Sequence, residues 1–155
     1  MSVRIFVPKD MAALAVGADE VAGKLIGAAV KAGREIRIVR NGSRGLFWLE
    51  PMVEVETPEG RVAYGPVAPE DVDGLVAAGL FDGGRGHPLC LGPTEEIDWL
   101  KRQTRLTFAR CGIVDPASLD DYTAHGGLDG LKRAIEVGPA GIIEEVTASG
   151  LRGRG

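Results

Sequence analysis

Hydrophobic and polar positions alternate in two different ways along the first forty residues. Val3 to Val7 is a short β-rich run, and Pro8 ends it because proline cannot donate a hydrogen bond to a sheet ladder. From about Asp10 to Lys31, apolar residues recur at helical spacing, and Gly33 follows, as glycine does at helix C-termini. Residues 35–39 alternate polar and apolar side chains. This order predicts a strand, a helix and a second strand.

The next forty residues predict a hairpin and a helix. Residues 52–57 and 61–64 are β-rich and flank the compact turn signal Pro58-Glu59-Gly60. Pro69 and the acids after it are typical of a first helical turn, and Gly79 of a C-terminal stop. Residues 1–82 therefore predict the order βαβ-ββ-α, which is the layout of an α/β, thioredoxin-like layered domain.

The second half of the chain predicts less regular structure. Residues 83–111 are expected to form a linker or arm, because their first part is crowded with glycine and proline. Residues 112–155 are expected to form a small helical segment. Its first helix opens at Asp115-Pro116, its second spans about 128–137, and its third opens at Pro139. The chain then closes on Gly-Leu-Arg-Gly-Arg-Gly155, an ending that looks truncated rather than capped.

Composition narrows the possible partners. The formal net charge of −4 argues against a nucleic-acid or anionic-membrane partner. No apolar run reaches the roughly 18 residues that a membrane span needs, and the N-terminus lacks the layout of a signal peptide, so we expect a cytoplasmic protein. Cys90 and Cys111 form no C-x-x-C pair; reduced thiols are the expectation, with a disulfide left open.

One short constellation carries plausible chemistry. The glycines of Gly153-Arg154-Gly155 let the backbone approach a ligand closely, and their N–H groups can bind an anion, while arginine pairs with phosphate; Arg152 is a weaker candidate. The alternative is a flexible basic tail. His87 and His125 lack partners at ligand spacing, so no metal site is expected, and no nearby motif supports nucleophilic catalysis.

The helices followed by S-G-L-R-G-R-G resemble the approach to the flavin site in the NADH-oxidising flavin subunit of respiratory complex I. NAD-reducing hydrogenases and NAD-dependent formate dehydrogenases share this module. Residues 103–155 have its arginine-rich lead-in, its D-P before a helix with Tyr122, and its G-G-L. With the fused front domain, the chain is similar over its length to the beta subunit of a soluble NAD-dependent formate dehydrogenase. In that family the loop continues as G-A-G-F-P, which this chain lacks.

The resemblance implies a role for the C-terminal residues. Gly153, Arg154 and Gly155 would begin the loop that binds flavin mononucleotide (FMN) and NADH. The parent subunit would carry FMN, NAD and an iron–sulfur cluster. With the other subunits of a heteromeric formate dehydrogenase, it would pass electrons from formate through FMN to NAD. The 155-residue chain alone is expected to hold no cofactor and to be inactive. A NAD-reducing hydrogenase or a complex I-like NADH dehydrogenase is the alternative parent.

The resemblance also implies that the front domain has lost the ligands of an iron–sulfur cluster. Relatives of the front domain hold a two-iron cluster through cysteines spaced C-x4-C and C-x3-C. The surrounding glycines and prolines set Pro8, Ala13, Ser43 and Phe47 at these four positions. Iron–sulfur clusters need thiolates, which these side chains do not provide. The resemblance therefore also supports a second reading, a cofactor-free module that docks onto sister subunits. Phe47 and Trp48 would then fill the vacated space or contact a partner subunit.

Overall fold

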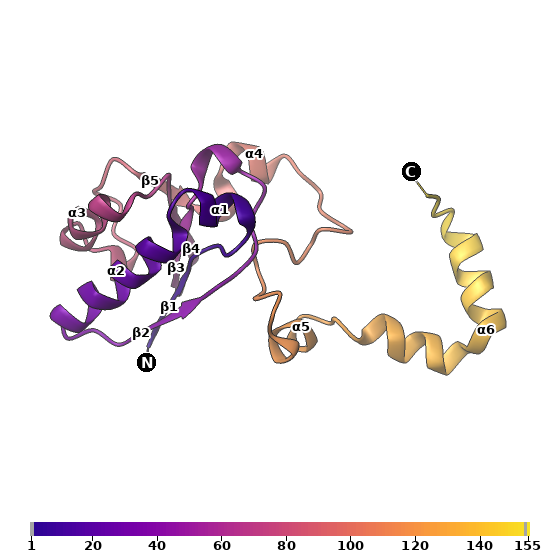
Figure 1. The fold of residues 1–155 in the computed structure, drawn as a ribbon. Coiled ribbons are helices and arrows are strands. Elements are labelled where there is room, and N and C mark those ends of the chain that lie inside the picture. Colours follow the sequence, from indigo (N-terminus) through magenta and orange to yellow (C-terminus); the bar gives the residue numbers. More distant parts are fainter. Residues whose placement is uncertain (1, 154) are drawn as a thin grey trace. The chain divides into compact units, whose positions relative to one another are not determined.

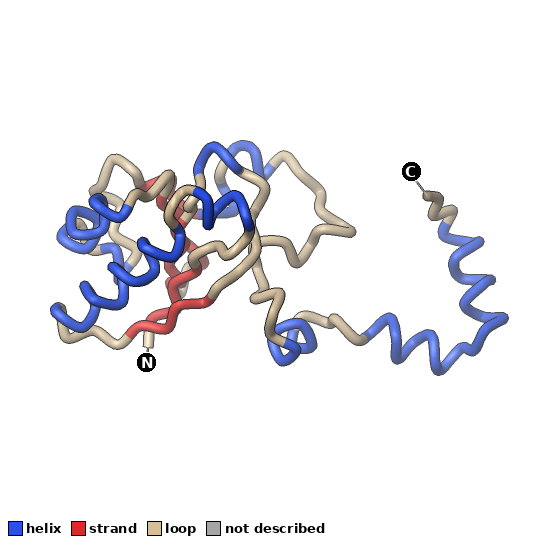
Figure 2. Tube along the Cα trace, in the orientation of Figure 1, coloured by secondary structure: helices blue, strands red, loops and turns tan. Residues whose placement is uncertain are grey.

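The computed structural model describes residues 2–153 and 155 and divides the chain into two compact units, residues 1–116 and 117–155 (Figure 1). The first unit is built on a five-stranded sheet of order β2-β1-β3-β4-β5 (Figure 2). β1 pairs in parallel with β2, and every other neighbouring pair is antiparallel. The strands are β1 (Val3–Phe6), β2 (Ile36–Val39), β3 (Val53–Thr57), β4 (Gly60–Tyr64) and β5 (Cys90–Pro93).

The first three α-helices of the chain pack on one face of this sheet. α1 (Met11–Ala15) begins at Asp10, whose carboxylate accepts hydrogen bonds from the backbone N–H groups of Ala12 and Ala13. α2 (Ala18–Lys31) buries a helical stripe that includes Val21 and Leu25, and α3 (Val72–Ala77) adds Val72 and Leu75 to the same core. Val53 and Val55 of β3 meet these helices from the sheet. Burial of each large aliphatic side chain contributes roughly 1.5–3 kcal/mol.

The predicted α/β class is confirmed, with local differences. The single helix expected over residues 10–31 is two helices, because Gly17 takes a left-handed φ of 94° between α1 and α2. Short 3₁₀ turns flank the helices and strands: η1 (Phe47–Leu49), η2 (Pro69–Asp71), η3 (Leu80–Asp82) and η4 (Thr94–Glu96). Residues 83–111, expected to form a linker or arm, contribute β5 to the sheet and α4 (Asp98–Lys101) beside it. The boundaries at 82 and 111 stay predictions, whereas the structure divides the chain after Pro116.

The second unit consists of α5 (Leu119–Ala124) and α6 (Asp129–Ser149). α5 begins after Ser118, whose hydroxyl accepts from the N–H of Asp121, and not at the predicted Asp115-Pro116. α6 joins the two predicted helices across a kink at Gly138, where φ is 70° and ψ is 177°. The Arg133 guanidinium reaches Glu145 across this kink at 2.6 Å. Within the described part of the chain, no helix has the length and apolar character needed to cross a bilayer.

Candidate functional site

The two loops that carry the expected cluster positions lie side by side. The backbone N–H of Lys9 donates to the carbonyl of Asn41 at 2.9 Å, and the Arg40 guanidinium donates to the carbonyls of Val7 and Pro8, both at 3.1 Å. These bonds hold residues 7–9 against residues 40 and 41. The structure therefore brings the first loop beside the second, as a shared site between them requires.

The four side chains at those positions differ in their surroundings. Pro8 and Ala13 are buried, and Ser43 is half-buried, whereas Phe47 is 64% exposed and its neighbour Trp48 is 59% exposed. Two rings that are mostly in solvent do not fill an internal space. This corrects the expectation that Phe47 and Trp48 occupy the volume that sulfur and iron would take. Their exposure instead agrees with the alternative, contact with a partner.

Ser43 belongs to a hydroxyl–carboxylate pair in place of a thiolate site. Its hydroxyl donates to Glu50 Oε1 at 2.7 Å and accepts from the N–H of Gly45 at 2.9 Å. The other oxygen of Glu50 accepts from the N–H of Met52 at 2.9 Å. Burial raises the pKa of Glu50, against the lowering effect of these hydrogen bonds, and the charge of Asp10 adds to the rise. The hydroxyl of Ser43 and both carboxylate oxygens of Glu50 are thus paired with other groups of the chain.

The donor groups at this corner do not fit an iron–sulfur cluster. Such clusters are held by cysteine thiolates, or by a mixture of cysteine and histidine, and the four positions offer neither. Cys90 and Cys111 are free thiols, half-buried on β5 and exposed after α4, respectively. Among residues 2–153 and 155, no three histidine, cysteine, aspartate or glutamate side chains are arranged to bind a metal.

A buried ion network lies next to this corner, on the sheet face opposite α2. Glu54 of β3 is 0% exposed and Arg44 is 5% exposed. Nε and Nη2 of Arg44 donate to the two oxygens of Glu54 at 3.0 and 2.8 Å, and Nη1 reaches Glu95 at 2.8 Å. Arg61 lies 3.6 Å from Glu54 and 3.4 Å above the ring of Phe6. Burial works to lower the pKa of Arg44, but Glu54 and Glu95 outweigh it, so the pKa is raised.

This network fastens the segment after α4 to the second loop. The side-chain amide of Asn41 and the guanidinium of Arg61 both donate to the carbonyl of Gly112, at 2.8 and 2.9 Å. Farther along, Nη2 of Arg105 donates to the backbone carbonyl of Arg44 at 2.7 Å. The segment is therefore anchored at two points beside the corner where the first and second loops meet.

A pocket of about 600 Å³ opens between the anchored segment and the second loop. Its walls mix apolar and polar side chains and include the exposed thiol of Cys111. The residues that line it are Ser43, Arg44, Gly45, Gln103, Thr104, Arg105, Leu106, Thr107, Phe108 and Cys111.

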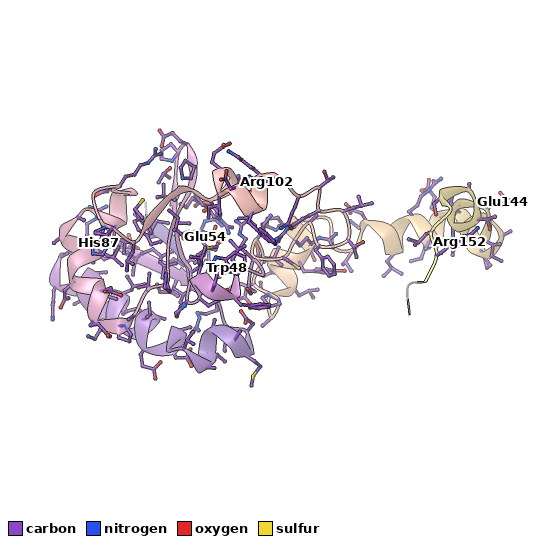
Figure 3. The ribbon with its side chains drawn as sticks, turned by 90° about the horizontal axis from the view of Figure 1, so that it is seen from above. Trp48, Glu54, His87, Arg102, Glu144 and Arg152 are labelled. Carbon is purple, nitrogen blue, oxygen red and sulfur yellow. The ribbon has the colours of Figure 1, made fainter. Side chains whose placement is uncertain are left out.

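Exposed aromatic rings stand on the same part of the first unit. Trp48 in η1 and Trp99 in α4 meet edge to face, with ring centroids 5.6 Å apart. Both elements rest on a second small core, in which Leu46 and Leu100 are buried. Figure 3 labels Trp48, with the buried Glu54 and with Arg102 at the end of α4, on this unit. The site predicted from the sequence did not include Trp99, Arg44 or Glu54.

The predicted flavin-loop residues lie at the end of the second unit. Gly153 and Gly155 are exposed, and a Cβ added to either would meet open space. Arg154 lies outside the described residues. Arg152 is exposed after α6 (Figure 3). The structure thus leaves the assignment of Gly153, Arg154 and Gly155 to an FMN and NADH loop as a prediction.

Comparison with known proteins relates part of the chain to a hydrogenase subunit. No protein-family model matches. A stretch of 55 residues is 46% identical to the NADP-reducing hydrogenase subunit HndC of Solidesulfovibrio fructosivorans. The stretch is 36% of this chain and 11% of that protein, so the match spans about a tenth of the relative's length. It does not single out formate dehydrogenases.

Solved structures of similar fold include the thioredoxin-like [2Fe-2S] ferredoxin of Aquifex aeolicus. The wild-type protein is 24% identical, over 59% of this chain and 97% of that one, with a TM-score of 0.47. A cysteine-to-serine variant of the same ferredoxin is 25% identical, over 58% and 98%, with the same TM-score. The α/β fold is assigned to the first unit from the sheet and helices of this chain, not from these similarities.

Proposed function

We propose that the chain is the front part of an electron-transferring, NAD(P)-linked oxidoreductase subunit. In this subunit the first unit acts as a cofactor-free scaffold, and the second unit leads into a flavin-binding loop. The similarity of 55 residues to a subunit of an NADP-reducing hydrogenase is the observation that carries this proposal. The S-G-L-R-G-R-G run, which begins at Ser149, the last residue of α6, agrees with it.

The surface of α6 supports the idea that the second unit belongs to a larger domain. None of its 21 residues is buried, and even the large apolar side chains of Leu131, Ile135 and Ile143 are more than half exposed. An amphipathic helix normally covers its apolar face with other elements, and large exposed apolar patches mark places where something else packs. Further parts of a flavin domain would provide that cover.

In the parent complex, we propose formate as the electron donor, oxidised in another subunit, and NAD as the acceptor. FMN, when bound, supplies the exchange between one-electron and hydride transfer. The chain's contribution would be backbone N–H groups of Gly153 and Gly155 toward the flavin phosphate and the cationic side chain of Arg154 toward the anionic dinucleotide. A hydrogenase is the second candidate parent, and the identity with HndC favours it specifically. We place the complex in the cytoplasm.

Two measurements test the parent assignment. The reading frame past Gly155 should continue with G-A-G-F-P, and a different continuation would exclude the flavin loop. The complex isolated with this chain should then reduce NAD with formate as donor; reduction with hydrogen but not formate would assign the hydrogenase. The 155-residue chain alone should show no flavin absorbance after dialysis against FMN. Flavin that stays bound after dialysis would contradict the proposal that the 155-residue chain holds only part of the flavin site.

Cysteine substitution tests the scaffold assignment. A variant with Pro8, Ala13, Ser43 and Phe47 all changed to cysteine should bind iron and sulfide on anaerobic reconstitution and become coloured, because the two loops lie together. The unaltered chain, treated identically, should contain neither element. A variant with cysteine at positions 8, 13 and 47 that keeps Ser43 is the matched control and should bind less iron and sulfide. A colourless four-cysteine variant that still folds would show that the positions are misassigned.

A further inference from the structure

We propose that the aromatic and basic side chains around α4 form a docking face for an acidic segment of a partner protein. The proposal deepens the scaffold role and rests on it. The docking face consists of three rings, one aliphatic side chain and two guanidinium groups: Phe47, Trp48, Trp99, Leu106, Arg102 and Arg105.

The centre of the docking face is apolar and held in place. Phe47, Trp48 and Trp99 are 64, 59 and 57% exposed, and the two indoles support each other edge to face. Leu46 and Leu100, buried directly beside them in sequence, anchor η1 and α4 to the second core. Aromatic side chains on fixed elements lose little conformational entropy when they are covered, and such residues dominate the affinity of protein interfaces.

The edge of the docking face carries positive charge. From Trp99 to Val114 the chain has four basic residues and no acidic one. Lys101 is balanced by Asp98 and Glu96, at 3.3 and 3.8 Å. Arg102 is exposed and forms no ion pair with any described residue. The Arg105 guanidinium donates to the amide oxygen of Gln103 and to the backbone carbonyl of Arg44, not to a carboxylate. Two guanidinium groups are thus available to acids on a partner.

A protein fits this chemistry better than a nucleic acid does. Proteins that bind duplex DNA commonly neutralise about six to ten phosphates, whereas two arginines stand uncompensated here and the net charge of the chain is −4. Carboxylates pair bidentately with arginine, and an apolar centre with a polar edge is the ordinary anatomy of a protein interface. The expected occupant is therefore a segment that presents apolar side chains together with aspartate or glutamate.

Intrinsic fluorescence tests this face selectively. The chain has two tryptophans, and both belong to the docking face, so its indole emission reports this surface alone. The 155-residue chain is titrated with three short amphipathic peptides, built from leucine with glutamate, glutamine or lysine. The glutamate–leucine peptide should shift the emission to shorter wavelength and saturate. Its Kd should be about tenfold lower than that of the lysine–leucine peptide and should rise with salt.

Substitutions locate the contact. Arg102→Glu should weaken binding of the glutamate–leucine peptide about fivefold, because it replaces an attraction by a repulsion of similar size. Trp99→Leu should weaken it about tenfold, with Trp48 still reporting. Arg37→Glu is the matched control: Arg37 is exposed on β2, the strand at the opposite edge of the sheet from β5. This control should leave the Kd within about twofold.

The outcomes separate the two proposals. Equal binding of the lysine and glutamate peptides, equal effects of Arg102→Glu and Arg37→Glu, or tighter binding of heparin than of the glutamate–leucine peptide would each overturn the docking face. Iron and sulfide in the unaltered chain would overturn the scaffold role instead, and would be seen by elemental analysis whatever the peptides do.

Discussion

The buried pair of Arg44 and Glu54 leads to the sharpest stability prediction. Glu54→Gln keeps the shape of the side chain but removes its charge, which leaves the 5% exposed guanidinium of Arg44 with Glu95 as its carboxylate partner at 2.8 Å. Removing one member of a buried ion pair costs about 3–5 kcal/mol. Because Glu95 remains and the glutamine oxygen still accepts one hydrogen bond, we expect a loss of about 3 kcal/mol in the free energy of unfolding.

Urea unfolding followed by tryptophan emission measures this loss, since both indoles belong to the first unit. With a denaturant dependence of about 1.5 kcal/mol/M, the midpoint should fall by roughly 2 M. Glu56→Gln is the matched control on the same strand. Glu56 pairs with Arg4 at the surface, where their side chains are 37 and 45% exposed, so its loss should cost less than about 1 kcal/mol.

The double variant Arg44→Met with Glu54→Leu gives an independent check. Replacing both members of a buried pair with apolar side chains commonly restores stability, because neither member is left buried without the other. The double variant should therefore be more stable than Glu54→Gln alone. Similar midpoints for Glu54→Gln and Glu56→Gln, or a double variant less stable than Glu54→Gln, would refute the view that burial makes this pair important.

Two further predictions concern neighbouring positions. Burial raises the pKa of Glu50 above its ordinary value of 4.5, so the folded state favours the protonated carboxyl. The stability that protonated Glu50 contributes is fully present below pH 4.5 and is lost as the pH rises through the pKa of the folded state. Glu50→Gln should therefore gain stability relative to the unaltered chain as the pH rises above 4.5; a difference in urea midpoints that does not change with pH would contradict this. Gly112→Ala should cost about 3 kcal/mol, since φ is +77° and the new Cβ would lie 2.3 Å from the Arg44 side chain. Gly92→Ala, with φ +83° and open space around the new Cβ, should cost about 1 kcal/mol in the same urea unfolding assay.

Local patterns were sufficient for the elements of the first 82 residues. Strand alternation, helical spacing and turn residues act over a few positions, so β1 to β4, α2 and α3 could be predicted within a few residues. The strand β5 could not. Residues 90–93 contain glycine and proline and show no alternation; they become a strand because the edge of β4 offers free backbone groups, with Tyr64 opposite Cys90.

The absence of sulfur at positions 8, 13, 43 and 47 was determined by the sequence alone, because no fold can supply a thiolate that the side chains lack. The fate of the acids on β3 was decided by the tertiary structure. Glu54 and Glu56 alternate with valines in the same way, yet Glu54 is buried and Glu56 is not, since the buried side chain is covered by Arg44 and Arg61. Likewise, Trp48 and Trp99 are distant in sequence, and only the packing of η1 and α4 on a shared core makes them one surface.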